Sequence, residues 1–182
     1  MKDNEYISKD DFLCYNCVYE KRCSRASFYQ WKPMTCPEFR SVKFENMKVN
    51  VKNMKNFDKE KFERWLANNA KPKSTGYCAR HVRLALEASG LEIATYPPSA
   101  YLYKTLLPLY DFKEVEVNIK NYKPEVADIV VWDKNEITRH GHIQGYTSVG
   151  WVSDFLQKTI YPNSKHPIVW TKGGYSIFRR YE

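Results

Sequence analysis

One cysteine, Cys78, stands apart from the others and lies where a helix should begin. It follows a segment of proline, serine, threonine and glycine at residues 72–76, and it precedes apolar residues at helical spacing. The pattern predicts a helix from about Cys78 to Gly90. A thiol at a helix N-terminus faces the positive end of the dipole and free N–H groups, which favour the thiolate and can hold an oxyanion. Cys78 is therefore a candidate nucleophile, although a lone cysteine is about as often a small buried apolar side chain.

Two histidines near a predicted strand are candidates for the base that such a nucleophile needs. His140 and His142 flank Gly141, and residues 141–148 have a strand-like pattern. In a strand the two imidazoles would share a face, so the spacing permits either one. Asp154, in the run that follows, is placed to accept the remaining ring N–H of His142 and to complete a Cys–His–Asp arrangement. Taken singly, His142 is also interpretable as an ordinary strand-end histidine and Asp154 as a turn or helix cap.

The elements around these residues predict an α+β fold. The patterns indicate an amphipathic helix with Asp58 as its N-cap, the helix that begins at Cys78, a second short helix, an extended segment and three strand-like runs. Apart from the Cys78 helix, they cover residues 58–69, 99–107, 112–117, 126–132, 141–148 and 151–157. A cysteine-bearing nucleophile helix packed on a small antiparallel sheet is the layout of papain-like hydrolases.

Three short motifs resemble the CHAP amidases and their NlpC-type relatives. Residues 74–79 read STGYCA, residues 127–132 read ADIVVW and residues 141–143 read GHI. The resemblance covers about residues 71–180 and implies a papain-like enzyme that cleaves stem-peptide or cross-bridge amide bonds in peptidoglycan. It also implies Cys78 as nucleophile, His142 as base and Asp154 as the group that orients the base. Two positions depart from the family pattern, because Ala127 replaces a glycine and Asp154 falls where NlpC-type enzymes often carry a second histidine.

The proposed mechanism suggests how the substrate is held. The backbone N–H of Cys78 would bind the oxyanion of a thioester-forming reaction. Four aromatic residues are candidate substrate contacts, although aromatic residues in strands more often belong to the core or stabilise the surface. They are Tyr77, Trp132, Tyr146 and Trp151.

The other four cysteines cluster near the start of the chain. A C-x-x-C pair followed by two more cysteines, in a segment too small for a core of its own, predicts a structural four-thiolate zinc site. Disulfides and an iron–sulfur cluster remain alternatives. The candidate ligands are Cys14, Cys17, Cys23 and Cys36. We therefore expect a cysteine-rich segment at residues 1–45 and a catalytic domain at residues 57–182.

Composition limits where such an enzyme would act. The chain has 182 residues and a net charge of +8, which favours polyanions such as nucleic acid or a carboxylate-rich cell wall. It lacks a run of about 18 apolar residues and the apolar core of a secretory signal. We expect a chain made in the cytoplasm without membrane insertion, which reaches the wall through lysis or export. The run WVSDFLQ at residues 151–157 resembles phage-encoded or type VI secretion amidase effectors, a likeness that suggests a cognate immunity protein as partner.

Two other classes of function fit parts of the sequence. A protease or transglutaminase-like enzyme acting on protein would use the same fold and the same triad, since neither fixes which amide is attacked. A zinc-containing module could bind nucleic acid, because the chain is basic and has fourteen tyrosines that could stack on bases. That second interpretation leaves the combination of Cys78, His142 and Asp154 as coincidence.

Overall fold

A five-stranded antiparallel sheet organises the part of the chain that the computed structural model describes, residues 57–93, 96–162 and 165–181. Residues 57–93 and 99–181 fall within one compact unit. The strand order is β1-β5-β2-β3-β4, so the last strand of the chain lies inside the sheet. The strands are β1 (Lys113–Glu114), β2 (Ile129–Trp132), β3 (His142–Thr147), β4 (Gly150–Val152) and β5 (Tyr175–Arg179).

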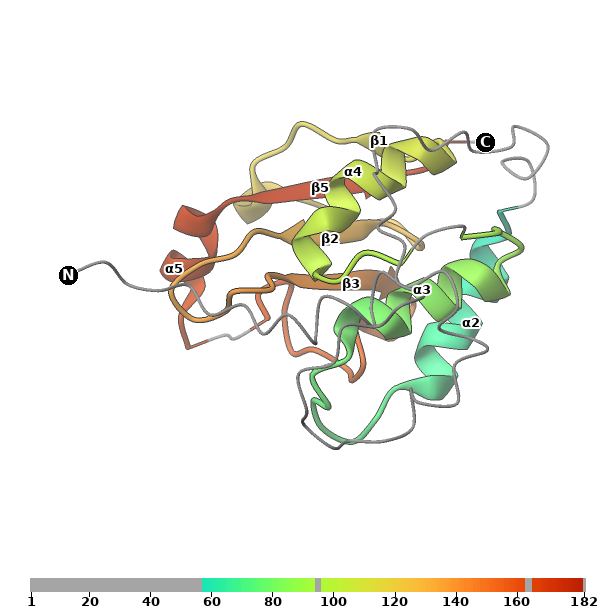
Figure 1. The fold of residues 1–182 in the computed structure, drawn as a ribbon, viewed down its shortest axis with the longest axis horizontal. Coiled ribbons are helices and arrows are strands. Elements are labelled where there is room, and N and C mark those ends of the chain that lie inside the picture. The colour runs from blue at the N-terminus through green and yellow to red at the C-terminus, as the bar shows by residue number, and fades with distance from the viewer. Residues whose placement is uncertain (1–56, 94–95, 163–164, 182) are drawn as a thin grey trace, which may run out of the picture. The chain divides into compact units, whose positions relative to one another are not determined.

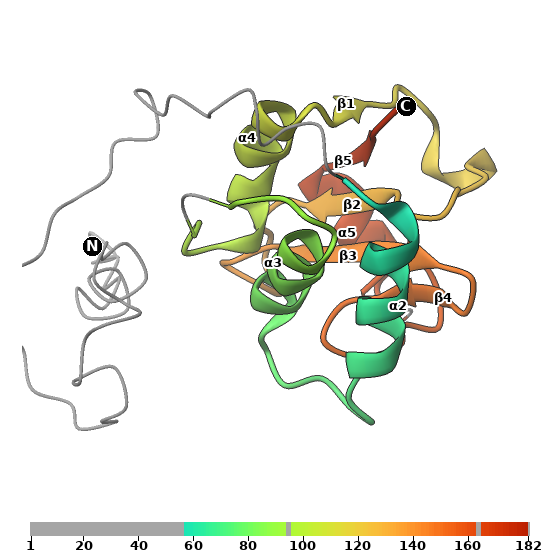
Figure 2. The same cartoon turned by 90° about the vertical axis from the view of Figure 1, so that its right-hand side faces the viewer.

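Two helices pack side by side against β3 (Figures 1 and 2). Helix α2 (Lys59–Asn69) begins after Asp58, whose side chain accepts a hydrogen bond of 3.0 Å from the backbone N–H of Lys61. Helix α3 (Cys78–Ala88) buries one apolar stripe, and Gly90 follows it with a φ of 102°. Both helices begin and end within two residues of the bounds that their sequence patterns predict.

Gly145 sets the spacing between α2 and the sheet. A Cβ atom at this position would lie 2.7 Å from both Leu66 Cδ1 and Phe62 Cζ, closer than carbon atoms approach. The helix therefore packs directly on the backbone of β3. Because side chains alternate along a strand, Gly145 and Ile143 face the helices, whereas His142 faces the other side of the sheet.

An aromatic core covers that other side. Helix α5 (Pro167–Gly173) contributes Trp170, whose ring centroid lies 5.8 Å from that of Trp132 on β2. The buried members of this cluster are Ile119, Val130, Trp132, Trp151, Trp170 and Ile177. The sheet is thus covered on both faces, by α2 and α3 on one and by aromatic side chains on the other.

A buried ion pair joins the beginning of β2 to β5. Asp128 is completely buried, and its two oxygens accept hydrogen bonds of 2.7 and 2.8 Å from Arg179. Asp128 also accepts from the hydroxyl of Tyr122 and from the backbone N–H of Glu125. These partners neutralise a carboxylate that would otherwise be costly to bury. The aspartate of the ADIVVW motif is therefore structural.

Several elements are shorter than their sequence patterns predict. Strand β2 begins at Ile129 rather than at residue 126, because Ala127 has a φ of 71° that ends extended structure. The segment 112–117 contains only the two paired residues of β1. The helix predicted at 99–107 is divided into a 3₁₀ turn (Ala100–Leu102), α4 (Tyr103–Leu106) and a second 3₁₀ turn (Leu107–Tyr110).

The predicted cysteine-rich segment, residues 1–45, and its four proposed zinc ligands lie outside the described residues. Within the described residues, no three histidine, cysteine or acidic side chains form a group that could hold a metal ion. None of the described helices is long and apolar enough to cross a membrane.

Candidate active site

Cys78 is the first residue of α3 and lies against β3. Its thiol is free and its side chain is half-buried. The backbone of Ile143, the residue after His142, lies close enough to the sulfur to lower the pKa of the thiol. The structure thus brings the predicted nucleophile to the edge of the strand that begins with the predicted base.

Asp154 holds the loop that leads into Cys78. Its Oδ2 accepts hydrogen bonds from the N–H of Thr75 at 2.5 Å, from Thr75 Oγ1 at 2.8 Å and from Tyr77 N at 3.4 Å. Ser74 Oγ lies 3.5 Å from the same oxygen, and the backbone oxygen of Asp154 accepts from Lys71 N at 2.8 Å. Asp154 is completely buried. The side chain of Asp154, more than seventy residues away in sequence, therefore accepts the hydrogen bonds that no N-cap side chain of α3 accepts.

This carboxylate opposes ionisation of the thiol. Burial raises the pKa of Cys78 to about 11, and the negative charge of Asp154 adds to the effect, while the N–H of Ile143 acts against it. Burial alone would also raise the pKa of Asp154, but hydrogen bonds from Thr75 and Ser153 lower it below its ordinary value. The backbone of Cys78 and Ala79 at the helix N-terminus does lower the pKa of the thiol, as expected, but burial of the sulfur outweighs this effect.

His142 is the first residue of β3 and pairs in register with Trp132 of β2. The ring centroid of Trp170 lies 6.3 Å from that of the imidazole, edge to face. Burial lowers the pKa of His142 to about 4, although the charge of Asp154 and a hydrogen bond with Gln144 act in the opposite direction. At neutral pH the site therefore holds a neutral thiol and a neutral imidazole.

Gln157, which the sequence patterns did not single out, makes a further polar contact to His142. Its Nε2 lies 3.0 Å from His142 Nε2 and donates to Ser153 Oγ at 3.0 Å. The Ser153 hydroxyl in turn donates to Asp154 Oδ1 at 3.0 Å. Among the described residues, the position predicted for Asp154 beside the imidazole is thus occupied by Gln157, and Asp154 reaches His142 through two intervening side chains.

A tight turn brings Gln157 back toward the sheet. Strand β4 ends at Val152, and the N–H of Gln157 then donates to the backbone oxygen of Trp151 at 2.8 Å. Ser153 N donates to Phe155 O at 3.1 Å within the same turn. The predicted third run, residues 151–157, is therefore half strand and half turn. Polar residues at its 153, 154 and 157 positions were the available signal.

His140 does not share a strand face with His142. Gly141 between them has a φ of 66°, and a Cβ there would lie 2.2 Å from the backbone oxygen of Trp132. The chain bends at this glycine before β3 begins. His140 is exposed, and its Nδ1 lies 2.9 Å from Ser99 Oγ. Of the two candidate bases, His142 is the one on the strand beside Cys78.

The four predicted substrate contacts have different positions. Trp132 is completely buried and Trp151 is 6% exposed, and both belong to the aromatic core. Tyr146 packs against Trp151 with ring centroids 5.1 Å apart. Because Trp132 is not exposed, it cannot contact a substrate, and the prediction of a substrate contact is wrong for this residue. Tyr77, next to the nucleophile, is 41% exposed.

Comparison with solved structures identifies a similar protein. A chain of the type VI effector–immunity complex Tae3–Tai3 from Ralstonia pickettii matches with a TM-score of 0.59 and 28% sequence identity. The match covers 69% of this chain and 100% of the other chain. This chain is similar to Tae3.

A second structure, the selenomethionine form of the Tae3–Tai3 complex, gives a TM-score of 0.56 and 29% identity over 64% of this chain and 97% of the other. No protein-family model matches the sequence, and no curated protein does either. The likeness to Tae3 agrees with the α+β class, with helices packed on an antiparallel sheet.

Proposed function

We propose that this chain is an effector-like hydrolase that cuts amide bonds in bacterial peptidoglycan, with Cys78 as nucleophile and His142 as base. The observation that carries the proposal is the meeting of the Cys78 sulfur with β3 one residue after His142, in a fold similar to Tae3. We assign Asp154 to the same site as the residue that holds the nucleophile loop. A stem-peptide endopeptidase and an amidase both fit this chemistry.

The reaction begins from a neutral pair. The Cys78 sulfur attacks the scissile carbonyl as His142 takes the thiol proton, and His142 then gives that proton to the leaving amine. Water hydrolyses the resulting thioester and restores the thiol. The backbone N–H of Cys78, at the first turn of α3, is the proposed oxyanion donor. Starting from neutral groups suits a buried site, since neither reacting side chain has to carry a charge between turnovers.

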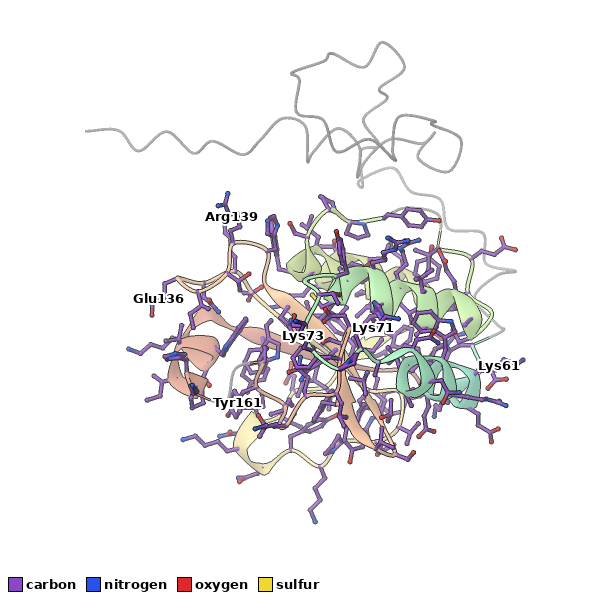
Figure 3. All side chains as sticks on the ribbon, turned by 90° about the horizontal axis from the view of Figure 1, so that it is seen from below. Lys61, Lys71, Lys73, Glu136, Arg139 and Tyr161 are labelled. Atoms are coloured by element: carbon purple, nitrogen blue, oxygen red, sulfur yellow. The ribbon has the colours of Figure 1, made fainter. Side chains whose placement is uncertain are left out.

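The surface beside the nucleophile suits an acidic substrate. Lys71 and Lys73 are exposed residues of the loop that Asp154 holds (Figure 3). Arg139 is exposed in the segment that precedes His142. Peptidoglycan stem peptides carry free carboxylates, which such cations attract. Tyr77, the residue before Cys78, is 41% exposed and is our candidate for a substrate contact.

The likeness to Tae3 extends the proposal to a partner and a place of action. The solved complexes pair that effector with Tai3. We infer that this chain is delivered by a type VI system to the cell wall of a target cell, and that a cognate immunity protein binds it. The zinc site at the amino-terminal cysteines stays a prediction, which elemental analysis of the untreated protein would test.

The decisive experiment is digestion of purified peptidoglycan. We expect the wild type to release fragments whose masses identify the cut amide bond, and we expect Cys78→Ala to release none. His166→Ala, a change at the residue before α5, serves as a control that should keep full activity. If the wild type left the wall intact but cleaved a folded or denatured protein, the substrate class would be wrong. If Cys78→Ala remained active, the nucleophile would be wrong.

A further inference from the structure

We propose that Asp154 positions both reacting side chains. Gln157 is the positioning residue that links Asp154, through Ser153, to the imidazole of His142. The catalytic meaning of this arrangement rests on the proposed function. The arrangement itself is a property of the side chains and can be tested without a substrate.

The first arm of the anchor leads to the nucleophile. Asp154 Oδ2 receives the N–H and hydroxyl of Thr75 together with the N–H of Tyr77, the residue that precedes Cys78. These contacts join positions 79 and 77 residues apart in sequence. Tyr77, the N-cap of α3, makes no side-chain capping bond of its own. The carboxylate of Asp154 therefore fixes the residue at which α3 begins, and this in turn fixes the position of the Cys78 sulfur.

The second arm leads to the base. Asp154 Oδ1 receives the Ser153 hydroxyl, Ser153 Oγ receives Gln157 Nε2, and that nitrogen lies 3.0 Å from His142 Nε2. Ser153 is completely buried and Gln157 is 6% exposed, so water does not compete for these bonds. Few side chains besides Gln157 have the length and the two N–H donors that this bridge uses.

The charge on Asp154 fixes the order of donation along the second arm. A carboxylate only accepts, so Ser153 must donate to it and must accept from Gln157. The second N–H of Gln157 then points at His142 Nε2, which accepts it when the neutral ring carries its proton on Nδ1. A ring in that state has no nitrogen free for the thiol proton, so the proposed reaction requires the Gln157 amide to turn and the ring to carry its proton on Nε2. A protonated imidazole has N–H on both nitrogens and would require Gln157 to turn its oxygen inward. Gln157 therefore fixes the direction of the ring, and the orientation of its amide decides which ring nitrogen is free to take the thiol proton.

Substitutions at Gln157 test the positioning role in the full chain. Gln157→Ala should lower kcat by about 10²-fold with little change in KM, because the imidazole loses its fixed direction. Gln157→Glu should move the acid limb of kcat/KM above pH 4, since a carboxylate beside the ring stabilises imidazolium. Ser153→Ala is matched by Ser89→Ala, which removes a similarly buried hydroxyl bond at the end of α3. Equal kinetic effects in the two serine variants, or an unmoved acid limb in Gln157→Glu, would overturn the role.

A second measurement keeps the anchor testable if peptidoglycan is not the substrate. Alkylation of Cys78 by iodoacetamide against pH, followed by mass spectrometry of its peptide, reports the thiol, and NMR of the imidazole reports His142. We expect Thr75→Val to change the thiol titration alone and Gln157→Ala to change the imidazole titration alone. Asp154→Asn should shift both titrations downward, because it removes a negative charge near each group. A shift in only one of the two would refute a shared anchor while leaving the proposed function standing.

Discussion

The two segments that carry the reacting groups are held in different ways. The loop before Cys78 is exposed along residues 71–77 and is secured by side-chain and backbone bonds to one residue, Asp154. The strand that begins at His142 is secured by backbone pairing to both β2 and β4. The position of the base is thus fixed by backbone pairing in the sheet, whereas the position of the nucleophile depends on a few polar contacts to the loop before it. Changes to those contacts should affect activity far more than stability, whereas changes in the strand should do the reverse.

The largest expected effect comes from removing the base itself. His142→Ala should lower kcat by roughly 10²- to 10⁴-fold, the range of general base catalysis, because the neutral thiol then has no group to take its proton. Peptidoglycan digestion with time-resolved product analysis measures it. His140→Ala is the matched control, since that imidazole is exposed and contacts Ser99 instead. A larger loss in the His140 variant would exchange the two assignments.

At acid pH, activity should be lost through protonation of His142. Because burial lowers the pKa of His142 to about 4, activity should fall tenfold per pH unit only below about pH 4. In the unfolded chain the imidazole binds its proton near the ordinary histidine pKa of 6.5, so this group should reduce stability as pH falls from 6.5 toward 4. Kinetics must therefore be read alongside circular dichroism at each pH. An acid limb near 6.5 in folded protein would show that the imidazole is not buried during turnover.

A pair of threonine substitutions compares the two segments directly. Thr75→Val removes a hydroxyl bond to Asp154, and Thr147→Val removes one of 2.7 Å from β3 to the backbone oxygen of Gly150. We expect Thr75→Val to lower kcat/KM about tenfold through misplacement of the sulfur. Thr147→Val should cost about 1 kcal/mol of unfolding free energy and leave kcat/KM unchanged. Urea unfolding and peptidoglycan kinetics on both variants test this comparison. Equal losses of kcat/KM in the two variants would contradict the claim that the two segments are held in different ways.

The smallest expected effect is a gain in stability at the start of β2. Ala127 has a φ of 71°, which an alanine adopts at a cost of about 1–2 kcal/mol, and glycine would remove that cost while gaining entropy in the unfolded chain. Ala127→Gly should therefore raise the unfolding free energy by about 0.5–1 kcal/mol with activity unchanged. Ala88→Gly, in α3, should lower it by a similar amount. A destabilised Ala127→Gly variant would contradict the conformational argument.

Local patterns predicted the elements that carry their own signals. Asp58 and Gly90 mark the ends of α2 and α3, and alternating residues mark β3. Strand β5 and helix α5 were not predicted. Strand β5 ends the chain yet pairs with β2 and β1, a long-range arrangement that no local pattern reveals. Helix α5 has seven residues and a single buried side chain, Trp170, so its amphipathic signal is weak.

In the candidate site, too, local patterns predicted some features and missed those that depend on residues distant in sequence. The order of Cys78, His142 and Asp154 and their neighbours predicts one catalytic site. The structure brings Cys78 to the strand that begins with His142 and Asp154 to the loop before Cys78, and their catalytic roles stay a prediction. The expected hydrogen bond between Asp154 and His142 did not follow, because a turn of five residues after β4 puts Gln157 against the ring instead. The expected thiolate failed for a related reason. Burial of the sulfur is the largest cause of its raised pKa, and the charge of Asp154, distant in sequence, adds to it. Spacing within the helix gives no sign of either.

The indole of Trp170 beside His142 has a practical consequence. Protonated imidazole quenches the fluorescence of a tryptophan that it touches, whereas the neutral ring does so weakly. With ring centroids 6.3 Å apart, the emission of Trp170 should report the charge on His142 in the unlabelled protein. In a His81→Ala variant, which removes the second such pair, Trp65 and His81 with centroids 5.7 Å apart, this emission would report the charge of the base in a stopped-flow instrument while a substrate is being turned over.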